Sequence, residues 1–129
     1  MKITATHIKD QTYKINARGH ELITAKPREG EDYPISPPEL FISSLASCIG
    51  IYAVDFLARR GVKTEGLEVE ADFEKITEDG KTRLDNIKIK LTLPEKLDEK
   101  YSNAFLKVID ACLVHETIRR NPEIKIEVK

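Results

Sequence analysis

The sequence is poor in cysteine, glycine and proline, and neither sign of charge is in excess. Its 129 residues include 2 cysteines, 6 glycines and 6 prolines, with 21 Lys and Arg against 22 Asp and Glu. Two cysteines are too few for a disulfide scaffold, and a hydrophobic fraction of 40% excludes a disordered or fibrous chain. Because a nucleic-acid surface needs a basic excess, the net charge of −1 predicts neither nucleic acid nor another polyanion as a partner.

The amino end also lacks the apolar core of a signal sequence. Residues 1–5 mix polar and apolar side chains, so we expect a cytoplasmic protein. The length fits a single domain over residues 1–129. In a reducing compartment, Cys48 and Cys112 are buried core residues, metal ligands or reactive thiols.

Alternating and helical hydrophobic patterns predict an α+β fold. An early hairpin is expected, with short strands in residues 12–16 and 21–24. Alternation predicts further strands in residues 67–74, 87–93 and 124–128, and Asp79-Gly80 is typical of a hairpin turn. Helical spacing predicts a helix over residues 97–111 and a short one from Cys112 to about Arg120.

The clearest predicted element is a long apolar helix. Ser36-Pro37-Pro38-Glu39 places Ser at the N-cap, Pro at the first helical position and Glu three residues after the cap. Apolar residues dominate from Leu40 to Ala58, and the following Arg59-Arg60-Gly61 is typical of a helix end. Such a helix must be surrounded by protein or lipid. Because Asp55 and several serines interrupt it, we expect a core helix covered partly by a second subunit, and no membrane span.

The local surroundings of Cys48 favour a structural role. It lies in the middle of the expected helix, beyond the first turn where the helix dipole favours an anion. Its helical neighbours are mostly apolar, and burial on such a face disfavours the charged thiolate. The local pattern therefore favours a buried structural cysteine.

Cys112 is expected where one helix ends and the next begins. Backbone N–H groups at a helix start favour an anion, and His115 lies three residues further on. The local pattern supports equally a reactive thiol and a small residue packed at a helix junction. A zinc site of both cysteines with His20 and His115 is not expected, because the spacing lacks close ligand pairs. We expect no metal and no cofactor.

Three segments together resemble the OsmC/Ohr family, the osmotically induced protein and organic hydroperoxide resistance group, and in particular its OsmC-like branch. They are Ser36–Phe41, Ala46-Ser47-Cys48 on the same helix, and Ala111–Thr117. The resemblance extends over nearly the whole chain. It implies an intertwined α+β homodimer, in which two central helices are flanked by antiparallel-rich sheets and the active sites lie at the interface.

The resemblance also implies a thiol-dependent peroxidase that reduces organic hydroperoxides in oxidative-stress defence. Cys48 would attack the peroxide bond and become a sulfenic acid, and Cys112 would resolve it as a disulfide. An external dithiol would then restore both thiols. In the family an arginine and a helix-start glutamate activate the attacking cysteine. Arg18 and Glu39 are the candidates for these roles, with Arg28 as a second arginine.

The sequence departs from the family pattern at several positions. Pro38 stands where the Ohr branch carries its arginine-binding glutamate, Leu113 replaces the usual proline, and the residues around Arg18 differ from those of the Ohr branch. These departures leave open a non-enzymatic redox-sensing or small-ligand-binding dimer of the same fold. A structural module whose cysteines only pack is a third interpretation.

Overall fold

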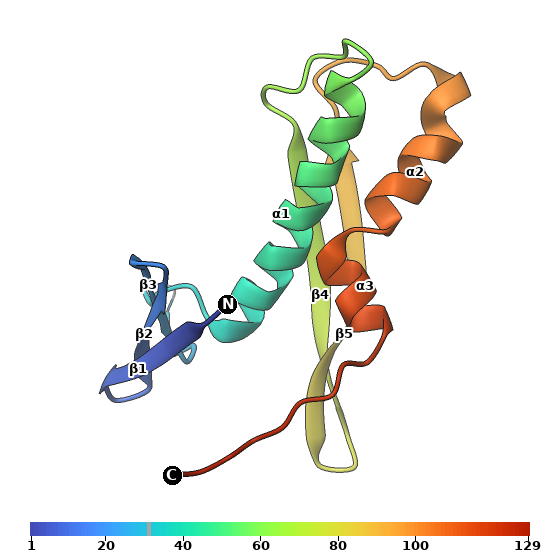
Figure 1. The fold of residues 1–129 in the computed structure, drawn as a ribbon. Coiled ribbons are helices and arrows are strands. Elements are labelled where there is room, and N and C mark those ends of the chain that lie inside the picture. Colours follow the sequence, from blue (N-terminus) through green and yellow to red (C-terminus); the bar gives the residue numbers. More distant parts are fainter. Residues whose placement is uncertain (31) are drawn as a thin grey trace. The chain divides into compact units, whose positions relative to one another are not determined.

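A computed structural model of the chain describes residues 1–30 and 32–129 (Figure 1). It has the expected α+β composition, with antiparallel strand pairs. The elements, in chain order, are β1 (Ile3–Lys9), β2 (Thr12–Ala17), β3 (His20–Ala25), α1 (Pro37–Ala58), β4 (Glu68–Glu78), β5 (Lys81–Thr92), a 3₁₀ turn (Glu99–Tyr101), α2 (Ser102–Asp110) and α3 (Leu113–Arg119).

These residues form two compact units, 1–42 and 43–129, and each is described by itself. The single domain expected over residues 1–129 stays a prediction. In the first unit, β2 lies between β1 and β3. Arg18 and Gly19 form the turn between β2 and β3 and have φ angles of 54° and 83°. Positive φ at both central residues suits the twist of a tight hairpin, so the predicted turn is confirmed.

The start of α1 is fixed by the predicted capping box. The Glu39 carboxylate accepts the backbone N–H of Ser36 at 3.0 Å and its hydroxyl at 2.6 Å, while the Ser36 hydroxyl oxygen accepts the Glu39 N–H at 3.4 Å. Both side chains therefore satisfy backbone groups that a helix start leaves without partners. Ser36 is 1% exposed, so water does not replace these bonds.

The end of α1 also follows the sequence. Gly61 adopts a φ of 70°, and its N–H donates to Ala58 O at 3.1 Å while the N–H of Val62 donates to Leu57 O at 3.1 Å. This pair of bonds is a Schellman motif, in which glycine avoids the strain of a left-handed conformation.

The core of the second unit lies between α1, the β4–β5 hairpin and α2. Its buried cluster consists of Leu45, Ile49, Ala53, Phe56, Leu57, Phe105, Ile109 and Cys112. The inward-facing side chains of β4 and β5, among them Val69 and Ile89, pack against this cluster. A Cβ atom on Gly50 would lie 3.4 Å from Val69, which is an ordinary van der Waals contact, so α1 packs directly against β4 here.

The β4–β5 hairpin is longer than the sequence pattern predicted. Its strands extend to a tight turn at Asp79-Gly80, where Glu78 pairs with Lys81. The expected helix over residues 97–111 is shorter than predicted. It is preceded by a 3₁₀ turn in which the Asp98 carboxylate accepts the Lys100 N–H at 3.0 Å.

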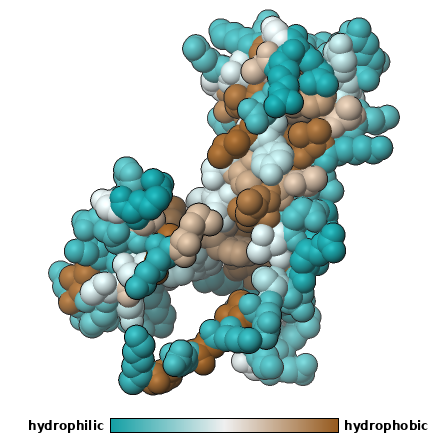
Figure 2. All heavy atoms as spheres, in the orientation of Figure 1, coloured by the Kyte–Doolittle hydropathy of each residue, from teal (hydrophilic) through white to brown (hydrophobic). Residues whose placement is uncertain are grey.

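The strand predicted at residues 124–128 is wrong. This segment has no strand partner among the described residues and leaves Ile124, Ile126 and Val128 exposed by 79%, 89% and 90%. Its apolar and polar residues alternate at the bottom of Figure 2. Alternation gives a segment an apolar face, but a strand also needs a neighbour that accepts its backbone hydrogen bonds.

Within one chain, α1 is only partly covered. It is long and apolar enough to cross a membrane, and 33% of its most apolar window is buried. Core helices of water-soluble proteins share these properties, so length and composition do not by themselves indicate a span. Ile51 is 64% and Val54 38% exposed, which leaves an apolar face for another surface to cover.

The capping box predicts a measurable contribution to stability. Ser36→Ala should lower the free energy of unfolding by about 1 kcal/mol, because the buried cap loses its hydrogen-bonding side chain. Ser47→Ala is the matched control, since Ser47 is exposed and bonds only to carbonyls of the preceding turn. Urea unfolding of both variants measures the difference. Equal stabilities would contradict a stabilising cap.

Candidate functional site

The predicted reactive thiol Cys48 lies near the middle of α1. Its side chain is half-buried and packs against the core cluster beside Leu45 and Ile49. The sulfur is therefore surrounded mainly by apolar side chains while its residue keeps some access to solvent. The local pattern favoured a buried structural cysteine, whereas Cys48 is only half-buried.

Cys112 occupies the junction between α2 and α3, as the sequence predicted. It is 0% exposed and forms the N-cap of α3, with an extended backbone at φ −62° and ψ 151°. Its sulfur accepts the backbone N–H of His115 at 3.4 Å. A thiol here performs the task that a serine or aspartate oxygen performs at most helix starts.

The two cysteines, far apart in the sequence, meet in the core as free thiols. Burial raises the pKa of the Cys112 thiol, and the neighbouring Cys48 raises it further through a side-chain hydrogen bond and through its charge. The backbone N–H groups of His115 and Val114 oppose this rise. Desolvation therefore raises the pKa of Cys112 more than the backbone N–H groups of the helix start lower it. At neutral pH, the Cys112 thiol is therefore protonated.

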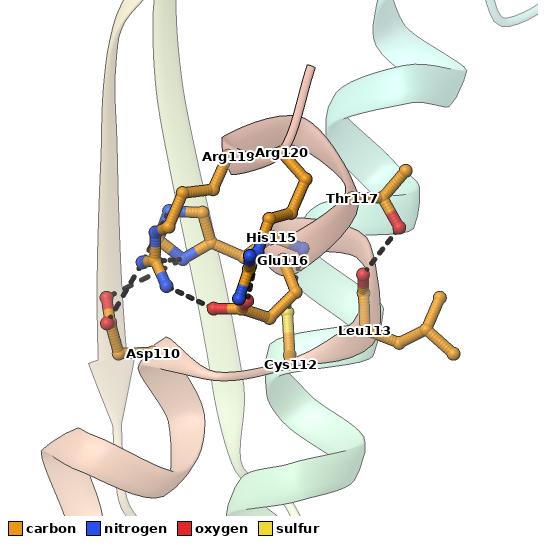
Figure 3. A network of polar contacts seen from close by, with 8 residues as sticks. All are labelled: Asp110, Cys112, Leu113, His115, Glu116, Thr117, Arg119 and Arg120. Atoms are coloured by element: carbon orange, nitrogen blue, oxygen red, sulfur yellow. Dashed lines mark hydrogen bonds and ion pairs between the residues drawn. The ribbon is translucent and has the colours of Figure 1, made fainter. Parts of the chain in front are cut away.

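The imidazole of His115 belongs to an ionic network. Its Nδ1 lies 3.6 Å from an Asp110 oxygen, and Arg119 Nη2 lies 3.3 Å from Nε2 and 3.0 Å from the other Asp110 oxygen. A second guanidinium nitrogen of Arg119 contacts Glu116 (Figure 3). The assistance expected from His115 thus reaches Cys112 through the backbone N–H.

This network was missed by sequence reasoning. The signal available was the spacing of Glu116 with Arg119 and Arg120, which brings opposite charges together on a short helix. Nothing local linked Asp110 to Arg119 across the helix junction, because that contact depends on the angle between two helices.

An apolar groove with a cavity volume of about 740 Å³ lies in the second unit, and neither cysteine is among the residues that line it. Leu45 and Ile49, which flank Cys48 along α1, contribute to its wall, and Asp110 and His115 add polar groups. The remaining wall is almost entirely aliphatic and aromatic and comes from β5, α2 and Ile118 of α3. A groove of this kind can hold a small organic molecule.

The other predicted site residues belong to the first unit. Arg18 lies in the β2–β3 turn and is exposed. An Arg28 guanidinium nitrogen donates to Asp32 O at 3.1 Å, and Glu39 takes part in the capping box. Cys48 and Cys112 belong to the second unit. The approach of an arginine or of Glu39 to Cys48 stays a prediction.

Comparison with known proteins identifies related folds and a family pattern. The family model described as OsmC-like protein matches residues 30–127. No curated protein matches the chain by sequence. An OsmC-like protein from Mycoplasma pneumoniae has a similar structure, with a TM-score of 0.76 and 18% identity over 92% of this chain and 86% of that one.

Two further solved structures carry names that refer to hydroperoxides. The organic hydroperoxide resistance protein OhrB of Bacillus subtilis has a TM-score of 0.66 and 17% identity, covering 99% of this chain and 96% of its own. An organic hydroperoxide resistance protein OsmC from Legionella pneumophila has a TM-score of 0.69 and 16% identity, covering 94% and 91%. At these low sequence identities, the structural similarities show that this chain has the same fold as those proteins.

The raised pKa of Cys112 predicts a pH-dependent stability. The folded thiol keeps its proton to higher pH than the unfolded one, so its stabilising contribution is complete below the ordinary pKa of about 8.5 and is lost as pH rises towards the folded value. Under reducing conditions, the free energy of unfolding should therefore fall more steeply for the wild type than for Cys112→Ser between about pH 8 and 10. Urea unfolding measures both slopes, and parallel slopes would contradict the shift.

Proposed function

The chain belongs to the OsmC-like protein family, and on this premise we propose that it is a thiol-dependent peroxidase that reduces organic hydroperoxides in oxidative-stress defence. The observation that carries the proposal is the meeting of Cys48 and Cys112 in one apolar core, with Cys112 held protonated. A two-cysteine peroxidase needs one sulfur to attack and a second within reach to resolve the product.

The chemical cycle assigns one role to each thiol. The Cys48 thiolate attacks the terminal oxygen of the hydroperoxide, the O–O bond breaks, and the alkoxide takes a proton and leaves as an alcohol. The Cys112 thiol then attacks the Cys48 sulfenic acid, and water leaves as the disulfide forms. An external dithiol reduces this disulfide by two successive thiol exchanges and becomes oxidised itself.

The apolar groove of the second unit supports an organic substrate, although neither cysteine lines it. Its wall is largely apolar, and the burial of an alkyl group provides about 0.8 kcal/mol per CH₂. Hydrogen peroxide has no such group. The proposed preference is therefore for hydroperoxides with an alkyl or aryl substituent.

Activation of Cys48 is proposed to come from the amino-terminal unit. A guanidinium beside a thiol favours its anion, and Arg18 and Arg28 are the candidates. In this proposal Glu39, which also caps α1, orients the arginine. Pro38 removes the glutamate that the Ohr branch uses, so the arginine is held differently here.

A second candidate function follows from the same Pro38 substitution. If no carboxylate positions the arginine, the chain acts as a redox sensor or small-ligand binder that is oxidised once and not efficiently recycled. The apolar groove favours this alternative as well. Sustained consumption of hydroperoxide with excess dithiol distinguishes an enzyme from a stoichiometric sensor.

We further propose that the protein works as a cytoplasmic homodimer. The exposed apolar face of α1, which includes Ile51 and Val54, and the unpaired alternating segment 124–128 are surfaces that a second copy can cover. Burial of apolar area is the main driving force for such an association. No nucleic acid, membrane, metal or cofactor takes part in this proposal.

Substitution of the cysteines tests the assignment of roles. Cys48→Ser should abolish turnover of an alkyl hydroperoxide, because the attacking sulfur is gone. Cys112→Ser should retain the first attack and leave a sulfenic acid that a dimedone-type reagent traps. Stopped-flow peroxide consumption and mass spectrometry of the trapped protein measure both effects. Unchanged turnover in Cys48→Ser would rule out Cys48 as the attacking residue.

A charge on the exposed face of α1 tests the dimer. Ile51→Lys should convert a dimer to a monomer in light-scattering chromatography, because the lysine ammonium cannot be desolvated cheaply at an apolar interface. Leu106→Lys is the matched control, since Leu106 is comparably exposed on α2, by 59% against 64%. A wild-type monomer at all concentrations would contradict the proposal.

A further inference from the structure

The third helix, α3, buries little surface against the core next to Cys112. It has seven residues and none of them is buried. Val114 is its partly buried apolar contact with the core cluster. Cys112, directly before it, is 0% exposed. Segments with little buried apolar surface open locally at small free-energy cost, so the position of the Cys112 sulfur depends on what holds α3 in place.

Two side chains of α3, His115 and Arg119, contact Asp110 at the end of α2, and Arg119 makes the shorter contact. Arg119, the last residue of α3, contacts both Asp110, the last residue of α2, and Glu116 within α3 (Figure 3). The Asp110–Arg119 pair spans the two junction residues Ala111 and Cys112. A guanidinium suits this role because its planar fork can bind two carboxylates at once.

We propose that Arg119 is a positioning residue for Cys112. By latching α3 to the end of α2, it keeps the Cys112 sulfur against Cys48 and closed to solvent. The latch thereby decides whether a Cys48 sulfenic acid is captured as a disulfide before a second hydroperoxide reaches it.

The position of the Cys112 sulfur matters because two reactions compete for the Cys48 sulfenic acid. In capture, the Cys112 thiol attacks the sulfenic sulfur and water leaves. In over-oxidation, a second hydroperoxide transfers an oxygen to the sulfenic acid, which becomes a sulfinic acid while an alcohol leaves. The first reaction depends on how often Cys112 is in place, whereas the second does not. This consequence of the latch rests on the proposed peroxidase function.

The expected size of the effect is modest. Arg119 is 42% exposed, and its partners Asp110 and Glu116 are 61% and 36% exposed. Water and salt weaken ion pairs of this exposure, so loss of the latch should raise the open population of α3 roughly three- to fivefold.

The first experiment tests the latch without peroxide chemistry. In a Cys48→Ser background, alkylation of Cys112 by iodoacetamide should be roughly three- to fivefold faster in Arg119→Ala, with partial rescue in Arg119→Lys. Arg120→Ala is the matched control, because Arg120, the residue after α3, is 81% exposed and its ion pair is with Glu116 of α3. Added salt should accelerate alkylation of the parent and leave Arg119→Ala unchanged. Equal rates in Arg119→Ala and Arg120→Ala would overturn the proposal.

A second variant separates latching from folding. Asp110→Asn removes the charge that Arg119 and His115 both contact while leaving the sequence of α3 unchanged, and it should accelerate alkylation as Arg119→Ala does. Circular dichroism identifies a variant that is unfolded. An alkylation rate equal to that of the parent in a folded Asp110→Asn would also overturn the latch.

The last experiment uses the protein with both cysteines. After a pulse of cumene hydroperoxide, mass spectrometry should find more Cys48 sulfinic acid and less disulfide in Arg119→Ala than in Arg120→Ala. An unchanged ratio would overturn the role of the latch in capture. If the wild type does not react with the hydroperoxide, the proposed function fails, while the alkylation rates still decide the latch.

Discussion

The burial of the Cys112 thiol beside Cys48 is the constraint on which the rest of the site depends. A thiol in an apolar core resists ionisation, and a sulfur neighbour that can carry charge strengthens this resistance. The pair is therefore asymmetric before any substrate arrives. Cys112 is fully buried at a helix junction and has a raised pKa, while Cys48 lies half-buried on a long helix. Cys112 is also the N-cap of α3, and the Asp110–Arg119 ion pair joins the two helices that Cys112 separates.

Local signals in the sequence predicted the parts of the fold that local physics controls. The capping box at Ser36, the glycine at the end of α1 and the Asp79-Gly80 turn are each set by a few neighbouring residues, and each is found as expected. The strand expected at residues 124–128 failed because its alternation describes only one face of the segment. A strand also needs backbone partners, and none is present among the residues that the structure describes.

The site was predictable to a smaller extent. The position of Cys112 at a helix start followed from the sequence, but its meeting with Cys48 depends on tertiary packing and came only from family resemblance. Local reasoning weighed the helix start against burial and could not rank them. In the structure, complete burial raises the pKa of Cys112 more than the two backbone N–H groups lower it. The contact of Arg119 with Asp110 had no sequence signal, since it joins different helices. Arg18 and Glu39 stay predictions.

The environment of Cys112 also affects the return half of the proposed cycle. In thiol exchange, the sulfur whose thiol has the lower pKa leaves faster. A dithiol that attacks the sulfur of Cys48 must therefore expel Cys112 into surroundings that raise its pKa. A dithiol that attacks Cys112 instead avoids this cost, but it must first reach a sulfur that α3 covers.

Burial slows both routes, for different reasons. Opening of α3 relieves both, because it admits the dithiol and restores water around the departing thiolate. A lightly packed helix held by an exposed ionic latch fits this requirement, since a more deeply buried helix would protect the disulfide from the reductant that the cycle needs.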